Sequence, residues 1–178
     1  MKKQFLYLLL SVALTGCASH DENYVYPLTL SFSQPTEWNG KIIPSQQGCR
    51  ADGGKGNTPP LHVSDIPENT NLLIMEINDL DYGLLAKDGG LGAVGFYHKG
   101  GSAALLLPVP GETNDLPGFA FKEKTSRVHP SKPFAYTPPC IERKHHYSAT
   151  VKAVNRTGSF DKQKTILLGI GHIDLGVY

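Results

Sequence analysis

Hydrophobic and polar residues alternate along several short stretches of this chain, and a period of two is the pattern of strands with one buried face. The alternation is clearest over residues 28–32 and 146–154. Residues 72–77 are apolar almost throughout, so we expect that strand at the centre of a sheet. The predicted strands are residues 28–32, 61–63, 72–77, 93–97, 103–107, 146–154 and 173–178. The sequence shows no internal repeat and no sustained helical period.

Two stretches depart from the strand pattern. Ser159 is placed to cap a short helix running to Leu168, with Asp161 favourable in its first turn. Residues 108–139 contain seven prolines, which exclude a long helix there and predict an irregular segment over the surface. The 19 glycines and 13 prolines of the chain also favour many turns. The sequence therefore predicts a mostly β protein, an antiparallel β-sandwich with one or two short helices.

The first residues have the features of a bacterial lipoprotein signal. Two lysines precede an apolar run over residues 5–14, which is too short to span a bilayer and is typical of a secretory signal peptide. The run leads into Leu-Thr-Gly-Cys17, which matches a lipobox: cleavage leaves the cysteine as the new N-terminus, and its thiol receives a diacylglyceryl group. We expect a removed signal peptide over residues 1–16, a lipidated tether over 17–27 and one domain over 28–178. An ordinary signal peptide with an incidental cysteine is the alternative.

The predicted export bears on location and on the remaining cysteines. Ala18 follows Cys17 where an inner-membrane lipoprotein usually has aspartate, so we expect anchoring in the outer membrane, facing the periplasm. Cys49 and Cys140 are then the remaining thiols, and outside the cytoplasm they are expected to form a disulfide, although two separate thiols are the alternative. A formal charge of +1 gives no electrostatic case for a nucleic-acid partner.

Four polar side chains stand at the ends of two predicted strands. Asp79 and Asp81 follow the most apolar strand, and alternation sends His145 and Tyr147 to one face at the start of another. If these strands are neighbours, Asp79, His145 and Tyr147 line one pocket. The imidazole and phenol would donate hydrogen bonds there, which suits a phosphate or carboxylate ligand. Alternatively, the aspartates only close a turn.

Other chemistry has less support in the sequence. His145 and His146 are adjacent on a strand and point to opposite faces, so they do not chelate a metal together. The chain has no Gly-x-Ser-x-Gly elbow. Cys140 near His145 imitates a Cys/His pair, but a disulfide to Cys49 would silence that thiol. We therefore expect no metal, no cofactor and no catalysis.

Short motifs follow one another in a characteristic order along residues 28–178. They are Gly40-Lys41-Ile42-Ile43-Pro44, the loop with Cys49, Gly56-Asn57-Thr58-Pro59-Pro60-Leu61, Ile66-Pro67-Glu68-Asn69-Thr70, Asp79-Leu80-Asp81-Tyr82-Gly83, Tyr136-Thr137-Pro138-Pro139-Cys140, His145-His146-Tyr147 and Leu175-Gly176-Val177-Tyr178. In this order they resemble the phosphatidylethanolamine-binding protein (PEBP) family, in its bacterial, Raf kinase inhibitor protein-like branch. Each motif alone is weakly specific, and their shared order carries the resemblance.

The resemblance implies a β-sandwich with a small anion pocket at one end, able to hold phosphate, acetate or a phospholipid headgroup. The pocket residues carried over by position are Asp79, Asp81, His145 and Tyr147, with Pro139 near the rim. The chain also departs from the family. Residues 88–92 lack the family's second pocket histidine, and His98 matches it only if the alignment is shifted.

These observations together predict a lipid-anchored, non-catalytic binding protein of the cell envelope. Its expected ligand is a small anionic or phosphorylated molecule or a phospholipid headgroup. The alternative is a protein-interaction module or an inhibitor of an enzyme such as a kinase or protease, with the proline-rich segment 108–139 as its contact surface. A weak hydrolase is a third reading, and it would need Asp79 or His145 for turnover.

Overall fold

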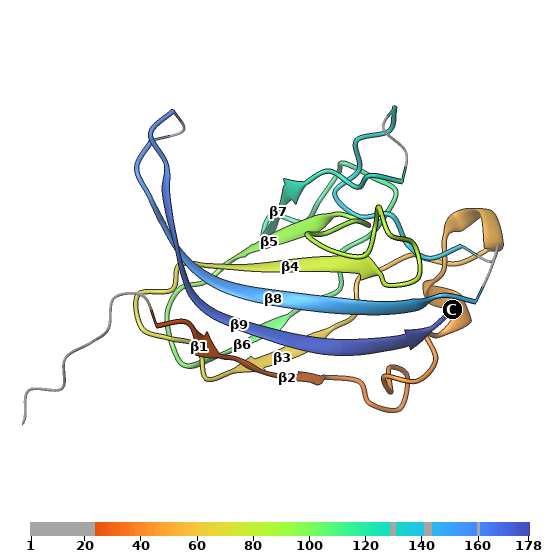
Figure 1. Cartoon of the computed structure of the whole chain (residues 1–178), viewed down its shortest axis with the longest axis horizontal. Coiled ribbons are helices and arrows are strands. Elements are labelled where there is room, and N and C mark those ends of the chain that lie inside the picture. Colours follow the sequence, from red (N-terminus) through yellow and green to blue (C-terminus); the bar gives the residue numbers. More distant parts are fainter. Residues whose placement is uncertain (1–23, 129–130, 141–143, 160) are drawn as a thin grey trace, which may run out of the picture.

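Two β-sheets pack face to face in the computed structural model, which describes residues 24–128, 131–140, 144–159 and 161–178 (Figure 1). The larger sheet has the order β1-β9-β8-β4-β5-β7 and the smaller one β2-β3-β6. The strands are β1 (Tyr26–Pro27), β2 (Thr29–Phe32), β3 (Leu61–Ser64), β4 (Leu72–Asp79), β5 (Ala93–Tyr97), β6 (Ala103–Leu106), β7 (Ala120–Lys124), β8 (His146–Thr157) and β9 (Lys164–Val177). Neighbouring strands pair antiparallel, except β1 beside β9. The predicted mostly β sandwich is confirmed, and its short helices are two 3-10 turns, η1 (Ser45–Gln47) and η2 (Arg50–Asp52).

Strand β4 is the most buried strand and supports both faces of the larger sheet. All eight of its residues are buried, as the apolar run in the sequence predicts. Leu73, Met75 and Ile77 point into the core between the sheets, whereas Leu72 and Ile74 join a smaller apolar cluster on the outer face. Since β4 lies between β8 and β5, its backbone is also paired on both edges.

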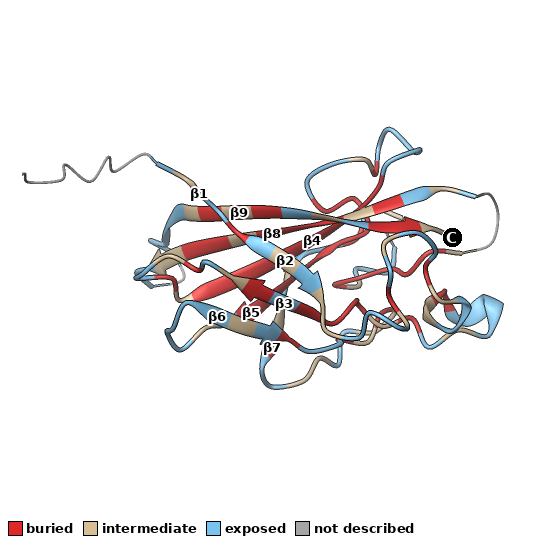
Figure 2. Cartoon of the chain, turned by 90° about the horizontal axis from the view of Figure 1, so that it is seen from below, coloured by how far each residue is buried: buried red, intermediate tan, exposed pale blue. Residues whose placement is uncertain are grey.

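The core lies between the two sheets, where buried side chains from both layers meet (Figure 2). The smaller sheet contributes Leu61, Val63 and Leu106, each at most 2% exposed. Facing them, the larger sheet contributes alternate residues of β4 and β8. Burial of a side chain of this size stabilises the fold by about 1.5–3 kcal/mol relative to an exposed one. Alternate residues of β4 and β8 face the core. At one end of the sandwich, these core-facing positions are occupied by polar residues in place of aliphatic ones.

The predicted helix over 159–168 is wrong: β9 begins at Lys164, and the preceding residues turn the chain between β8 and β9. Ser159 lies in that turn, where its carbonyl accepts a hydrogen bond from the Lys162 N–H at 2.8 Å. Pairing with the long strand β8 satisfies the backbone of residues 164–168, and this long-range ladder outweighs a local capping signal. The predicted short terminal strand is thus the end of a 14-residue strand.

The proline-rich segment 108–139 is not an irregular surface segment along its whole length. It contains β7, which pairs with β5 at the edge of the larger sheet. Its last part, residues 135–139, is buried. Prolines fit here because they flank the strand and leave the ladder of β7 intact.

The N-terminal boundary also differs from the expected one. Residues 26–27, which the sequence analysis gave to the tether, form β1 and pair in parallel with Gly169 and Ile170 of β9. The predicted signal peptide over 1–16 and the lipidation site Cys17 lie outside the described residues. No helix within the described ranges is long and apolar enough to cross a membrane.

Cys49 and Cys140 form the predicted disulfide, with their Cα atoms 5.2 Å apart. The bond joins residues 91 positions apart. By restricting the unfolded chain, a link of this span contributes about 4 kcal/mol to stability on the loop-entropy account. A hydrogen bond from the Cys49 N–H to the Pro139 carbonyl, at 2.7 Å, holds the same two segments together.

Glu76 is a buried charge on the outer face of β4, and its Oε atoms lie 2.7 Å from Lys124 Nζ and from Lys152 Nζ. Burial acts to raise the pKa of Glu76, but hydrogen bonds and charge from the two lysines outweigh it and hold this pKa below the ordinary 4.5. Its stabilising contribution is therefore complete above pH 4.5 and is lost as the pH falls through the lowered folded pKa.

We expect Glu76→Gln to lower the free energy of unfolding at pH 7 by about 1–3 kcal/mol, because two partly buried lysines lose their shared carboxylate. The difference from the wild type should shrink on acidification below pH 4.5, as measured by urea unfolding at several pH values. The control is Glu68→Gln, at an exposed turn position. If the difference in unfolding free energy between wild type and Glu76→Gln stayed constant down to pH 3, it would contradict the lowered pKa of Glu76.

Candidate functional site

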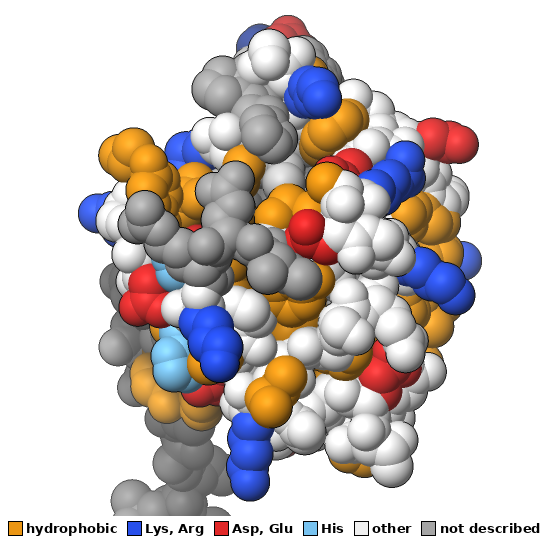
Figure 3. Space-filling model, turned by 90° about the vertical axis from the view of Figure 1, so that its right-hand side faces the viewer, with side chains coloured by type: hydrophobic (Ala, Val, Ile, Leu, Met, Phe, Trp, Pro, Cys, Tyr) orange, Lys and Arg blue, Asp and Glu red, His pale blue; other side chains and the backbone are white. Residues whose placement is uncertain are grey.

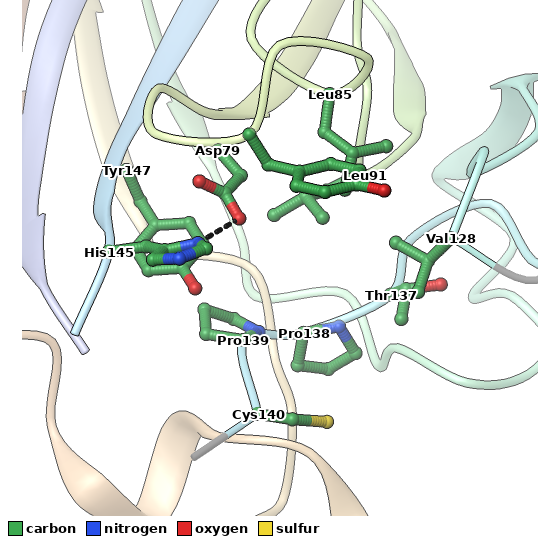
Figure 4. Close-up of a pocket in the computed structure, with 11 residues that line it drawn as sticks. Asp79, Leu85, Leu91, Val128, Thr137, Pro138, Pro139, Cys140, His145 and Tyr147 are labelled. Carbon is green, nitrogen blue, oxygen red and sulfur yellow. Dashed lines mark hydrogen bonds and ion pairs between the residues drawn. The ribbon is translucent and has the colours of Figure 1, made fainter. Parts of the chain in front are cut away.

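A pocket opens at the end of the sandwich where β4 ends and β8 begins. The register pairs Asp79 with Tyr147, and both continue the core-facing rows of their strands. His145 directly precedes β8, and its Nδ1 lies 2.7 Å from Asp79 Oδ2. The two strands are thus neighbours, and the structure brings Asp79, His145 and Tyr147 together as the spacing suggested (Figure 4).

Asp79 is 5% exposed, and both of its carboxylate oxygens have partners. Oδ2 pairs with His145, and Oδ1 accepts a hydrogen bond from the Asp81 N–H at 3.1 Å. The carboxylate therefore orients the imidazole through Nδ1 and leaves Nε2 as the ring nitrogen that a ligand can contact.

His145 is also fixed through its backbone by the C-terminal residue. The His145 N–H donates to the Tyr178 carbonyl at 3.2 Å, and the Tyr178 N–H donates to the His145 carbonyl at 3.1 Å. This reciprocal pair continues the β8–β9 ladder by one step beyond β8. The position of the imidazole is therefore tied to the sheet, although His145 precedes the strand.

Tyr147 adds a phenol to the polar side of the pocket. Its side chain is buried, and its ring centroid lies 6.5 Å from that of His145. Burial raises the pKa of Tyr147 well above its ordinary 10, and the negative charges of Asp79 and Asp81 raise it further. The phenol therefore stays protonated and can donate a hydrogen bond over the whole physiological pH range.

The opposite side of the pocket is mostly apolar, and it also holds the Thr137 hydroxyl beside Val128, a buried oxygen without a hydrogen-bond partner among the described residues (Figure 4). Leu85, Leu91 and Val128 face Asp79, His145 and Tyr147 across the cavity, and Pro138 and Pro139 lie between the two sides (Figure 4). The cavity has a volume of about 430 Å³, and its lining is completed by Tyr82, Thr137 and Cys140. A view onto this end shows hydrophobic side chains near the middle of the face, with histidine and acidic side chains to one side (Figure 3).

Four of the five ligand-binding residues predicted from the sequence line the pocket: Asp79, His145, Tyr147 and Pro139. Asp81 is exposed and is not among the lining residues. Its Oδ2 accepts a hydrogen bond from the His146 N–H at 2.7 Å, so it holds the start of β8 against the loop after β4. That contact helps to position His145 indirectly.

Sequence reasoning missed the apolar side, because Leu85, Leu91 and Val128 belong to loops without a periodic pattern. Asn78 fixes the first loop: its Oδ1 accepts from the N–H groups of Gly89 and Gly90 at 2.9 and 3.1 Å. Gly90 is needed because a Cβ there would lie 2.1 Å from the Leu85 carbonyl oxygen. The Gly89-Gly90 pair was the available signal in the sequence, because paired glycines favour a turn.

His145 is the one histidine among the described residues that line the pocket. His98 follows β5 at its far end, where its Nε2 lies 3.1 Å from the Gly101 carbonyl oxygen. Within residues 88–92, the stretch comparable to the one that carries a histidine in the PEBP family, Leu91 lines the cavity.

One group of potential metal ligands occurs among the described residues. Sulfur atoms of Cys49 and Cys140 and a carboxylate oxygen of Asp52 lie within 4.8 Å of one another. Both sulfurs belong to the disulfide, so neither is the thiolate that a metal would require.

Comparison with solved structures identifies the fold. CT736 from Chlamydia trachomatis, described as a PEBP homolog, is 20% identical with a TM-score of 0.50. YbcL from Escherichia coli, described as a new member of the mammalian PEBP family, is 18% identical with a TM-score of 0.53. Each match covers 85% of this chain and 97% of the other. The sequence matches no known family profile and no curated protein. At these identities the likeness shows that the chain has the PEBP fold.

The raised pKa of Tyr147 gives a direct test of the pocket's electrostatics. We expect its phenol to ionise well above pH 10 in the wild type and at a lower pH in Asp79→Asn, because one of the two negative charges is removed. Burial is the larger cause, so the pKa should stay above 10 in the variant. The measurement is NMR titration of ¹³C-labelled tyrosines, with Tyr147 assigned by its absence in Tyr147→Phe. An unchanged midpoint in Asp79→Asn would contradict the assigned cause.

Proposed function

We propose that this chain belongs to the PEBP family and that its end pocket binds a small anionic ligand without converting it chemically. The single observation that carries the proposal is the Asp79–His145 pair beside Tyr147, inside a cavity of about 430 Å³. The PEBP fold and the ordered motifs along residues 28–178 support the family assignment.

The polar side offers two donors to an anion. Asp79 accepts from Nδ1 of His145, so a protonated imidazole directs Nε2–H toward the cavity. The protonated phenol of Tyr147 is the second donor. One carboxylate or phosphate group has enough acceptor oxygens for both.

The chemistry of the lining supports binding rather than turnover. Cys140 lies in the pocket wall, but its sulfur is bonded to Cys49 and is not a nucleophile. Tyr147 is held in its protonated form, which suits a donor and not a nucleophile. The His145–Asp79 pair then has the role of positioning a donor.

Action as an interaction module or enzyme inhibitor has weaker support. That reading needs the segment 108–139 as a free contact surface. Instead, part of the segment is strand β7, and Pro138 and Pro139 are buried in the pocket wall. We therefore favour the pocket over the proline-rich segment as the functional feature.

Titration calorimetry with acetate and with inorganic phosphate tests the pocket. We expect millimolar or tighter binding of at least one anion, weakened at least tenfold by His145→Ala, because Nε2 is the donor that Asp79 orients. His62→Ala is the matched control, since His62 is exposed on β3 of the other sheet. Absence of binding at millimolar concentrations, or equal binding by His145→Ala, would refute the proposal.

We further propose that Cys17 carries the lipid that anchors this domain in the cell envelope, at the periplasmic face of the outer membrane. The support is the lipobox and the apolar run before it. We expect radiolabelled palmitate to be incorporated by the wild type and not by Cys17→Ser, with Cys17→Ser lost from the membrane fraction or retained as the uncleaved precursor. Labelling of Cys17→Ser at the wild-type level would refute the attachment site.

A further inference from the structure

The two sides of the pocket have different chemistry, and their arrangement limits what can fill it. Asp79, His145 and Tyr147 form the polar side, and Leu85, Leu91 and Val128 form the apolar side opposite (Figure 4). A ligand that fills the whole cavity must therefore be polar at one end and apolar at the other.

The apolar side is part of the protein core. Leu85 and Leu91 are 8% and 3% exposed and belong to the hydrophobic cluster between the sheets, and Val128 packs against that cluster. The carbonyl of Leu91 accepts a hydrogen bond from the Thr137 N–H at 2.9 Å, which ties the leucine to the segment that continues into Pro138 and Pro139. This surface is therefore formed before a ligand arrives, and binding does not have to order it.

The described groups on the polar side of the pocket provide no excess of positive charge. The pair of Asp79 and His145 has no net positive charge in either protonation state of the imidazole. The described lining residues include no lysine or arginine. Among the described lining residues, a dianion such as phosphate would thus find no excess of positive charge to compensate for its lost hydration. A carboxylate needs only the donors His145 Nε2 and the Tyr147 hydroxyl.

The volume is larger than a small inorganic anion needs. A cavity of about 430 Å³ is in the range that encloses small organic molecules. A carboxylate at the polar side leaves most of this space, next to Leu85, Leu91 and Val128, for apolar atoms. Each methylene buried there should tighten binding about fourfold.

We propose that the natural ligand class of this pocket is a monocarboxylate with an apolar body, such as a short-chain aliphatic or an aromatic acid, in preference to phosphate. This inference rests on the proposed function, because it names the ligand of the same pocket.

The test is calorimetric titration of the purified protein with acetate, butanoate, hexanoate, hexanol and phosphate. We expect affinity to rise about fourfold per methylene from acetate towards hexanoate. Hexanoate should bind at least tenfold more tightly than hexanol, which lacks the carboxylate, and more tightly than phosphate.

Val128→Thr tests the apolar side with almost no change of volume. We expect it to weaken hexanoate at least threefold and to leave acetate within twofold, because only the longer acid reaches Val128. Leu105→Thr is the control, since Leu105 is 47% exposed on β6 and lies outside the pocket lining. It should change neither affinity.

The outcomes separate this inference from the proposed function. Equal affinity for acetate and hexanoate, or tighter binding of phosphate, would overturn the ligand class and leave an anion-binding pocket. Equal affinity for hexanol and hexanoate would mean that the pocket does not recognise the negative charge, and would overturn both the ligand class and the proposed function. Absence of binding by every compound would overturn both. The wild-type ligand series decides the matter even if Val128→Thr is unstable.

Discussion

The antiparallel pairing of β4 with β8 sets the geometry of the pocket. Its register places Asp79 opposite Tyr147, with both side chains on the core-facing side of the larger sheet. If β8 slipped by one residue against β4, the side chain of Tyr147 would point to the outer face of the sheet. The residue then opposite Asp79 would be one whose side chain now points away from the pocket. The register is fixed by the rows behind these residues, since Met75, Ile77, Ala149 and Val151 must all remain in the core. The same burial that stabilises the sandwich thus aligns the polar groups at its end.

The pocket lies at one end of the hydrophobic core, and residues of the core form part of its lining. Along β4 the core-facing row passes from Leu73, Met75 and Ile77 to Asp79, so the last position is polar where the layer meets solvent. The apolar side of the cavity has the same origin, because Leu85 and Leu91 are members of the core cluster. A ligand that binds here would extend the core at one end and meet the donors of His145 and Tyr147 at the other.

Much of this arrangement could be predicted from the sequence, because strand patterns and motif order are local properties. The strands around residues 72–77 and 93–97 were predicted close to their bounds, and the cysteine pair was predicted correctly. Asp79, His145 and Tyr147 could be grouped because each stands at a strand end. Elements stabilised by distant partners were not predictable in the same way. Residues 164–168 form a strand because β8 is available to pair with them, against a local helix signal.

The apolar side of the pocket was missed for a related physical reason. Leu91 and Val128 are in different loops, and their contribution to one surface depends on how those loops are folded back. Asn78 and Gly90 determine the path of the first loop through hydrogen bonds and close backbone packing. The sequence shows a glycine-rich turn at that point. Only the three-dimensional arrangement shows which side chain this turn places in the lining of the pocket.

The parallel pairing of β1 with β9 determines at which end of the sandwich an N-terminal lipid tether would be attached. Tyr26 lies beside Gly169, whereas the start of β8 at His146 lies beside Val177, eight residues farther along β9. At roughly 3.3 Å per residue this separates the two points by about 26 Å along the sandwich, and they lie toward opposite ends of it (Figure 1). If a lipid is attached at Cys17, the tether would therefore join the sandwich at the end remote from the cavity. With such an attachment, the anchor would restrict the domain to one compartment without placing the pocket at its point of attachment, and a ligand dissolved in that compartment could reach the pocket by diffusion.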